Sequence, residues 1–139
     1  MSGARIDPAA VKQQPYYTHA VARLGQPVFL TGQVAWDVDG TVVGIGDIET
    51  QVMKAWANLE AVLADLNATV GDIVKLTTYA TDRAFIPSIH RERAKRYTTG
   101  HYPASTFIHV AGLAHPDLMV EIEAIVILPN HHPIFARSN

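Results

Sequence analysis

The hydrophobic and polar positions of the chain repeat with two different periods, and one region has the period of a helix. Between Asp47 and Leu66 the apolar residues recur at steps of three and four, which places them on one stripe of an amphipathic helix. The stripe consists of Ile48, Val52, Trp56, Leu59, Leu63 and Leu66. Asp47 is a suitable N-cap, because its carboxylate can accept hydrogen bonds from the free backbone N–H groups of the first turn. The segment 47–66 is therefore predicted to be a helix that buries one face.

A second helix is predicted over residues 83–99. Pro87 is compatible with a helix only near the first turn, where proline removes no helical hydrogen bond. Glu92 and Arg96 are four residues apart and form a favourable pair on one helix face. Gly100 is a natural stop, because glycine adopts the backbone conformation that commonly ends helices.

Four segments have the composition or the alternation of strands. They are residues 28–37, 72–81, 105–111 and 118–128. The sequence Asp37-Val38-Asp39-Gly40 indicates a hairpin turn, so residues 41–43 are expected to form a short return strand. Residues 1–15 are expected to be an irregular arm and residues 129–139 an irregular tail. The predicted order of elements is β-β-α-β-α-β-β.

The last strand carries the most informative pattern. Its even positions, from Leu118 to Leu128, are all apolar, whereas the odd positions place Glu121 and Glu123 among Met119, Ile125 and Ile127. Successive side chains of a strand point to opposite faces, so the apolar face is predicted to lie under the helices. A carboxylate among apolar neighbours must be paired, hydrated or functional, and two like charges raise one pKa, which suits proton transfer. The alternative is that both carboxylates are ion-paired at a seam between subunits.

These elements predict an α+β fold with one mixed sheet. Two helices cannot cover both faces of a sheet this broad, so both are expected on one face, with the other buried by oligomerisation. The length of 139 residues fits a single domain spanning residues 1–139, and 48% apolar residues are enough for a core with some surface left for a partner.

Charge and cysteine content exclude several classes of function. The formal net charge is -2 and no run of Lys or Arg stands out, which argues against a nucleic-acid partner. The chain has no cysteine, which excludes disulfides, Cys-ligated metals and Cys nucleophiles. No signal peptide or membrane span is visible, and a cytoplasmic location without membrane attachment is expected. No nucleotide-binding motif occurs, so no cofactor is expected.

Histidines and serines offer further candidate chemistry. None of the seven histidines has the spacing of a helical metal site, so no metal is expected. Ser105, Phe107 and His109 share one face of a predicted strand, so Ser105 and His109 could lie near Glu121. A Ser-His-Glu nucleophile system is disfavoured, because the chain has no G-x-S-x-G elbow.

Several segments, taken together and in order, resemble the RidA family, also called YjgF or L-PSP. They begin at Tyr17-Thr-His-Ala-Val and Val28-Phe-Leu-Thr-Gly-Gln-Val, and continue with Asn58-Leu-Glu in the first helix. Gly71-Asp-Ile-Val-Lys-Leu-Thr-Thr-Tyr, Tyr102-Pro-Ala-Ser-Thr and Val120-Glu-Ile-Glu-Ala-Ile complete the set. The resemblance covers most of residues 17–128. It implies a chorismate-mutase-like α+β fold, assembled as a homotrimer with three clefts between neighbouring subunits.

The resemblance also implies an activity, the hydrolysis of reactive enamines and imines such as 2-aminoacrylate. In such members an Arg after Pro-Ala clamps the substrate carboxylate, and a Glu on the last strand holds the attacking water. Here Ser105 follows Pro103-Ala104, so the clamp is missing and 2-aminoacrylate is expected to be a poor substrate. His90, His109 or Arg93 could supply charge instead.

The remaining positions match the family's cleft. The resemblance implies Glu121 as the catalytic residue, and substrate binding by Tyr17, Thr31, Gly32, His90, Ser105, Thr106 and Phe107. A small molecule is the expected partner, beside the other copies of a homotrimer. A non-catalytic metabolite-binding protein is the main alternative, and an endoribonuclease or translation inhibitor is a further one.

Overall fold

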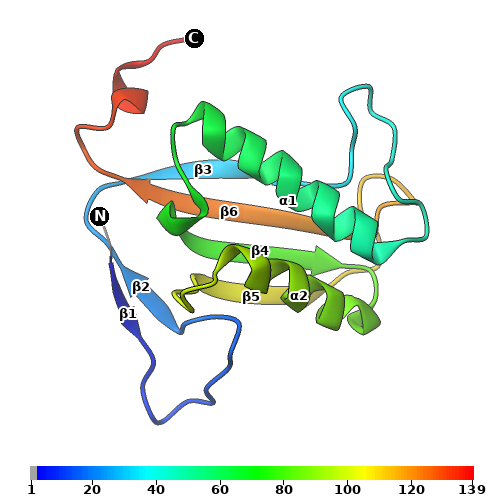
Figure 1. Cartoon of the computed structure of the whole chain (residues 1–139), viewed down its shortest axis with the longest axis horizontal. Coiled ribbons are helices and arrows are strands. Elements are labelled where there is room, and N and C mark those ends of the chain that lie inside the picture. Colours follow the sequence, from blue (N-terminus) through cyan, green and yellow to red (C-terminus); the bar gives the residue numbers. More distant parts are fainter. Residues whose placement is uncertain (1–2) are drawn as a thin grey trace.

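The computed structural model describes residues 3–139 and contains the two predicted helices above a mixed sheet (Figure 1). The helices are α1, Ile48–Asp65, and α2, Ile86–Arg96. The strands are β1 (Ala4–Ile6), β2 (Ala20–Ala22), β3 (Gln26–Gln33), β4 (Ile73–Ala80), β5 (Ala104–His109) and β6 (Val120–Leu128). Short 3-10 helices occupy Val70–Asp72, Arg83–Phe85 and Pro133–Ala136. No helix within residues 3–139 is long and apolar enough to cross a membrane.

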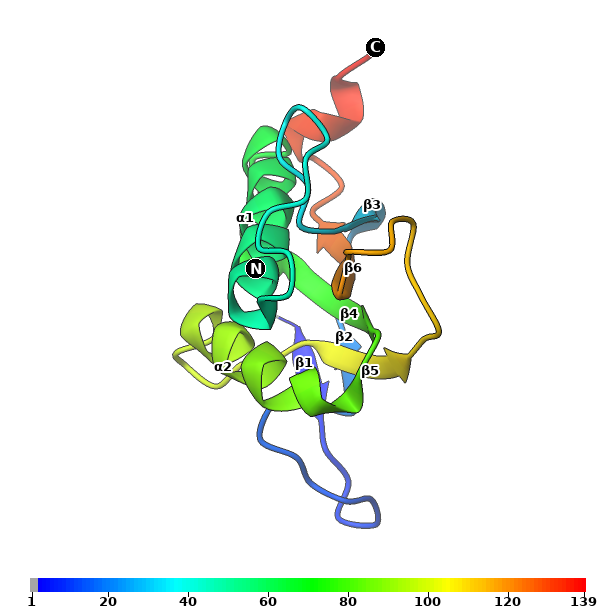
Figure 2. The ribbon, with the colours of Figure 1, turned by 90° about the vertical axis from the view of Figure 1, so that its right-hand side faces the viewer.

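The main sheet has the strand order β3-β6-β4-β5. β4 and β5 run parallel, joined by α2, whereas β6 is antiparallel to both β3 and β4. Both helices lie on the same face of this sheet (Figure 2), as the pattern predicts. The even positions of β6 are buried and the odd ones are half-buried, so the apolar face of the last strand does lie under the helices. We call the other side of the sheet the open face.

α1 forms where the periodic stripe predicts it. The Asp47 side chain accepts a hydrogen bond from the Thr50 backbone N–H and caps the helix. Val52, Trp56 and Leu59 are fully or almost fully buried against the sheet. α2 is shorter than predicted, because a 3-10 turn precedes it and it ends at Arg96.

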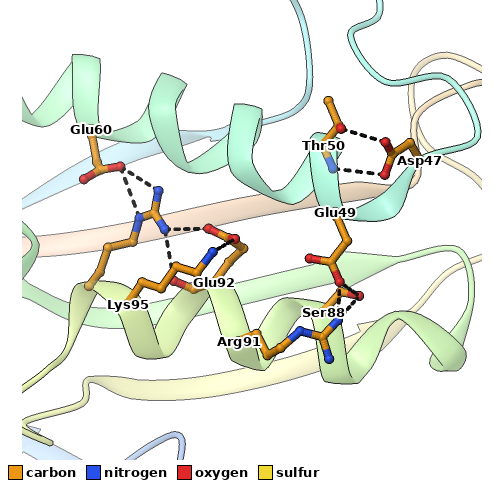
Figure 3. Close-up of polar contacts among 9 residues, drawn as sticks. Asp47, Glu49, Thr50, Glu60, Ser88, Arg91, Glu92 and Lys95 are labelled. Carbon is orange, nitrogen blue, oxygen red and sulfur yellow. Dashed lines mark hydrogen bonds and ion pairs between the residues drawn. The ribbon is translucent and has the colours of Figure 1, made fainter.

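Polar contacts join α2 to α1 along their length (Figure 3). Arg96 binds Glu92 one turn earlier, at 2.9 Å, as predicted, and also reaches Glu60 of α1 at 3.1 Å. At the other end of α2, Ser88 donates a hydrogen bond of 2.7 Å to Glu49 of α1, and Arg91 pairs with the same carboxylate. These contacts hold α2 in a fixed position over β4 and β5.

The predicted hairpin after β3 is wrong in part. Gly40 adopts a positive φ of 84° at the predicted turn, but the return strand is reduced to one bridge, between Trp36 and Val42. The side-chain amide of Asn58 on α1 donates to the backbone carbonyls of Val34 and Trp36. The short hairpin is closed by its own backbone hydrogen bonds, from Asp37 N–H to the Thr41 carbonyl and from Val43 N–H to the Ala35 carbonyl, so α1 satisfies two carbonyls that the return segment does not use.

The two ends of the chain are more ordered than predicted. Ala4–Ile6 of the expected irregular arm pairs with Ala20–Ala22 in a separate two-stranded sheet, while residues 1–2 lie outside the described part. In the expected irregular tail, the His132 ring caps a short 3-10 turn by accepting a hydrogen bond from the Ile134 backbone. Three-residue strands and single turns leave no periodic pattern in a sequence, which is why both were missed.

Candidate functional site

The first polar group of interest lies on the open face of the sheet, and we call it the acidic cluster. It consists of Glu121 and Glu123 on β6, Tyr79 on β4 and Gly32 on β3. Tyr79 lies opposite Glu121 in the strand register and donates a 2.7 Å hydrogen bond to Glu123. A Cβ atom at Gly32 would lie 2.2 Å from Glu121 Oε2, so only glycine leaves room for this carboxylate. β6 thus presents its two acids between two flanking strands.

The two carboxylates of the acidic cluster differ in their surroundings. Glu123 is held by the Tyr79 hydroxyl, and this hydrogen bond is the main reason that the pKa of Tyr79 is raised. Glu121 accepts no hydrogen bond from any group within residues 3–139, and burial, followed by the charge of Glu123, raises its pKa. The upward direction agrees with the prediction from two like charges on one strand face. Glu121 therefore keeps its oxygens free for a ligand or a water molecule.

The second polar group lies on the helix side of the sheet, and we call it the arginine cluster. Arg93 of α2 is buried, with 4% of its surface exposed. Its Nη1 donates to Ser105 Oγ on β5 at 2.9 Å and to the Tyr16 carbonyl at 3.1 Å, and its Nη2 donates to Thr78 Oγ1 on β4 at 3.2 Å. The guanidinium therefore joins a helix, two strands and the segment before β2.

A cavity of about 190 Å³ lies beside the arginine cluster. Its walls are Gln14, Tyr16, Tyr17, Ile86, His90 and Phe107. The Tyr16 and His90 rings are stacked, with their centroids 4.1 Å apart. Burial, followed by the charge of Arg93, lowers the pKa of His90, so this imidazole is neutral near pH 7. The structure thus brings together three predicted site residues, Tyr17, His90 and Phe107.

The predicted site residues separate into two sets on opposite faces of the sheet. Ser105 lies opposite Leu76 on the helix side, whereas Glu121 lies opposite Tyr79 on the open face. The helix-side set is Tyr17, His90, Ser105 and Phe107, and the open-face set is Thr31, Gly32, Thr106 and Glu121. Thr106 belongs to the second set because it follows Ser105 directly in β5, so its side chain points to the opposite face of the sheet. There it accepts a hydrogen bond of 2.7 Å from Lys75.

This separation overturns the possible proximity of Ser105 and His109 to Glu121 within one chain. Ser105, Phe107 and His109 do share one face of β5, as the alternation predicts. The register of β5 on β4 places this face toward α2, on the side of the sheet opposite to Glu121. His109 instead contacts the Thr81 carbonyl, at 3.1 Å. No Ser-His-Glu arrangement forms within residues 3–139 of a single chain.

Three residues of the two clusters were missed or left open by the sequence reasoning. Arg93 was one of three candidates for the missing charge, and it is the one that contacts Ser105. Its position three residues after His90 places both on one helix face, which is a signal that the sequence contains. Tyr16 and Tyr79 had no such signal, because their roles depend on pairings between distant segments.

Other features of the surface offer less chemistry. A cavity of about 250 Å³ borders Arg5, Arg96, Tyr97 and His101. The Arg5 guanidinium already binds the carbonyls of His101 and Tyr102, and Arg96 already binds carboxylates. Within residues 3–139, no group of three or more His, Asp or Glu side chains is arranged to hold a metal ion.

Comparison with known proteins places this architecture in a family. The family described as Endoribonuclease L-PSP matches residues 8–128. A 2-iminobutanoate/2-iminopropanoate deaminase of Dermatophagoides farinae is 30% identical over 130 residues, which cover 92% of this chain and 99% of that protein. A RutC family protein of Synechocystis is 30% identical over 114 residues, covering 81% of this chain and 86% of the relative.

A solved structure gives the same result for the fold. The crystal structure of YyfB from Yersinia pestis, described as a protein of unknown function of the conserved Rid protein family, superposes with a TM-score of 0.85. The two chains are 34% identical, and the match covers 92% of this chain and 100% of that one. The mixed sheet with two helices on one face is therefore shared with a Rid protein.

Proposed function

Because the chain belongs to the endoribonuclease L-PSP family, which includes the Rid proteins, we propose that it hydrolyses an enamine or imine to a carbonyl compound and ammonia. The observation that carries this proposal is the Glu121 carboxylate. Its pKa is raised, none of the described residues donates a hydrogen bond to it, and Gly32 makes room for it. A carboxylate in this state can hold a water molecule and accept its proton.

The chemistry requires one base and one proton donor. An enamine first takes a proton from solvent on carbon and becomes an iminium ion. Water then adds to the C=N carbon while Glu121 accepts one of its protons, which gives a carbinolamine. Glu121 returns this proton to nitrogen, the C–N bond breaks to release ammonia, and the remaining hydroxyl loses its proton to solvent as the C=O bond forms. Glu121 thus serves in both proton transfers and ends in its original state. A pKa raised toward neutrality suits a group that must both accept and return a proton.

We place the reaction between the subunits of a homotrimer. The open face carries exposed apolar side chains, with 73% of Phe29 and 38% of Ile108 accessible, and a second copy would bury them. The acidic cluster of one subunit then faces the cavity beside the arginine cluster of the next. Most oligomers of a single chain are closed and symmetric, which makes all of these clefts equivalent.

The substrate is expected to be larger than 2-aminoacrylate. Ser105 offers one hydroxyl where related proteins that use this compound have an arginine fork, so a small carboxylate is held less firmly. The cavity walls of Tyr16, Tyr17, His90 and Phe107 provide contact area for a flat or apolar side chain instead. An imine derived from an aromatic or bulky amino acid fits this combination best.

RNA cleavage is the activity that the family's name suggests, but the charges do not favour it. The net charge is -2, and Arg23, Arg91, Arg96 and Arg137 each pair with a carboxylate. Arg93 is buried. A phosphate backbone would therefore meet few free cations.

The test is ammonia release from imines that are generated in situ from a panel of amino acids by an amino-acid oxidase. We expect the protein to exceed the spontaneous rate, and Glu121→Gln to lower this acceleration by about 10²–10⁴-fold, as for loss of a general base. Glu60→Gln is the matched control, because Glu60 pairs with Arg96 away from both clusters. Acceleration that survives in Glu121→Gln, or none with any imine, would refute the proposal.

A further inference from the structure

Arg93 is a buried cation without an anionic partner. No carboxylate within residues 3–139 lies within 4.0 Å of its guanidinium, and its partners are three neutral oxygens. Its Nε is buried and has no hydrogen-bond partner. Arg23 and Arg96 differ, since each binds a carboxylate. Burying an unpaired charge is costly, and arginine does not lose its charge in a protein, so this arrangement points to a missing anion.

Ser105 lies between the buried Arg93 guanidinium and the surface. Its Oγ accepts the 2.9 Å hydrogen bond from Arg93, so its own hydroxyl proton remains available. No group within residues 3–139 accepts that proton. A hydroxyl that accepts from a guanidinium is polarised and becomes a stronger donor. Ser105 is also only half-buried, whereas Arg93 is enclosed.

The pair lies next to the aromatic cavity. The Tyr16 carbonyl shares Nη1 of Arg93 with Ser105, and the Tyr16 ring forms one wall of the cavity, stacked on His90. Phe107, another wall, follows Ser105 by two residues and points to the same side of β5. Thr18 forms a bridge with Ala104, which fixes the Tyr16 segment alongside Ser105.

We propose that the Ser105 hydroxyl donates a hydrogen bond to a carboxylate of the substrate, and that Arg93 is the positioning residue that orients this hydroxyl and supplies the positive charge behind it. The inference rests on the proposed function, since it assigns the substrate of that cleft. It names the substrate class as a carboxylate with a flat apolar side chain. Ser105 offers the carboxylate a single hydrogen bond, and the Arg93 charge lies behind it without direct contact. The aromatic walls of the cavity must therefore orient the rest of the substrate.

The test compares a carboxylate with its neutral amide. Phenylpyruvate is the 2-oxo acid that imine hydrolysis would produce from phenylalanine, and its amide has the same shape without the charge. We expect calorimetry to show the acid binding at least about tenfold tighter than the amide to the unmodified protein. Ser105→Ala and Arg93→Met should each bring this ratio close to one while the amide affinity stays within about twofold. The double variant should lose no more than either single one, because the two residues act through one contact.

The controls separate a binding role from a structural one. Ser105→Thr keeps a hydroxyl and should retain most of the preference for the acid. Thr41→Ala removes an exposed hydroxyl in the turn after β3, outside both clusters, and should leave the ratio unchanged. If Arg93→Met does not fold, Ser105→Ala decides alone, since it removes one oxygen and leaves the helix intact.

The outcomes distinguish this inference from the proposed function. Equal weakening of acid and amide in both variants would make the pair structural and overturn the inference. Absence of a preference for the acid in the unmodified protein, or no binding of either compound, would overturn it as well, even if Glu121-dependent ammonia release is observed. A preference that requires Ser105 and Arg93, without any ammonia release, would sustain the inference and refute hydrolysis.

Discussion

The acidic cluster and the arginine cluster lie on opposite faces of one sheet, and each contains a charged group that lacks a partner of opposite charge within residues 3–139. On the open face, Glu121 is a carboxylate without a hydrogen-bond donor among residues 3–139, next to a second carboxylate. On the helix side, Arg93 is a cation without a carboxylate within the same residues. Each cluster is built from well-placed neighbours, yet neither balances its charge.

The difference shows why a single chain would hold only half of the proposed site. A four-stranded sheet stands between the clusters, so no side-chain movement within one chain can join them. On the helix side, α1 and α2 cover the sheet and enclose Arg93, but no carboxylate within residues 3–139 reaches it. On the open face, Phe29 and Ile108 remain exposed around the two carboxylates. A second copy packed across the open face would place the acidic cluster of one chain beside the arginine cluster of the other, as proposed above.

The largest expected effect comes from preventing that second copy from binding. Phe29→Asp places a charge at the most exposed apolar position of the open face, on edge strand β3. We expect the proposed trimer to dissociate into folded monomers, since a charge buried at an interface is costly. Ammonia release should fall by more than about 10²-fold, because the acidic cluster no longer faces a cavity. Light scattering after size-exclusion chromatography measures the mass.

Val38→Asp is the control for this prediction. Val38 is fully exposed but lies at the turn after β3, beyond the sheet, so its replacement should change neither mass nor activity. A Phe29→Asp protein that is monomeric and fully active would show that one chain contains the complete site, and the division into two half-sites would then be wrong.

The sequence predicted which side chains share a face within each strand better than it predicted which strands lie next to one another. The alternation in β6 correctly assigned the even residues from Val120 to Leu128 to the helix side and Glu121 to the open face, because period two is visible within one segment. The partners of those faces depend on long-range pairing. β4 lies between β6 and β5, and this order, which sets Ser105 apart from Glu121, has no local signal. The contacts of Asn58 on α1 with the Val34 and Trp36 carbonyls are also long-range and have no local signal.

A smaller effect is expected from moving Glu121 without removing it. In Gly32→Ala, the new Cβ would meet Glu121 Oε2 at 2.2 Å, and the flexible carboxylate must swing away. Stability should change by no more than about 1 kcal/mol, because the displaced atoms are the end of a side chain. Turnover should fall by about 10–10²-fold, since a misplaced catalytic group loses its alignment. Thermal unfolding and initial rates of ammonia release measure the two effects.

Gly112→Ala is the matched control, because a Cβ at Gly112 meets nothing within 4 Å. It should leave both stability and rate unchanged. If Gly32→Ala retained full activity, the position of the Glu121 carboxylate would not matter, and the acidic cluster would lose its proposed role.

The smallest effect is expected from removing the charge of Glu123, which contributes to the raised pKa of Glu121. Glu123→Gln removes the like charge beside Glu121 but retains an oxygen that can accept the Tyr79 hydrogen bond. The ionised Glu123 raises the pKa of Glu121, so its removal lowers that pKa, although burial, the larger cause, remains. If Glu121 must be ionised to accept a proton, the acidic limb of kcat/KM moves to lower pH, while the plateau rate changes by less than about threefold. A limb that moves to higher pH, or one that persists unchanged in both Glu123→Gln and Glu121→Gln, would assign the titration to another group. The arginine cluster should not respond, so the preference for phenylpyruvate over its amide serves as the internal control.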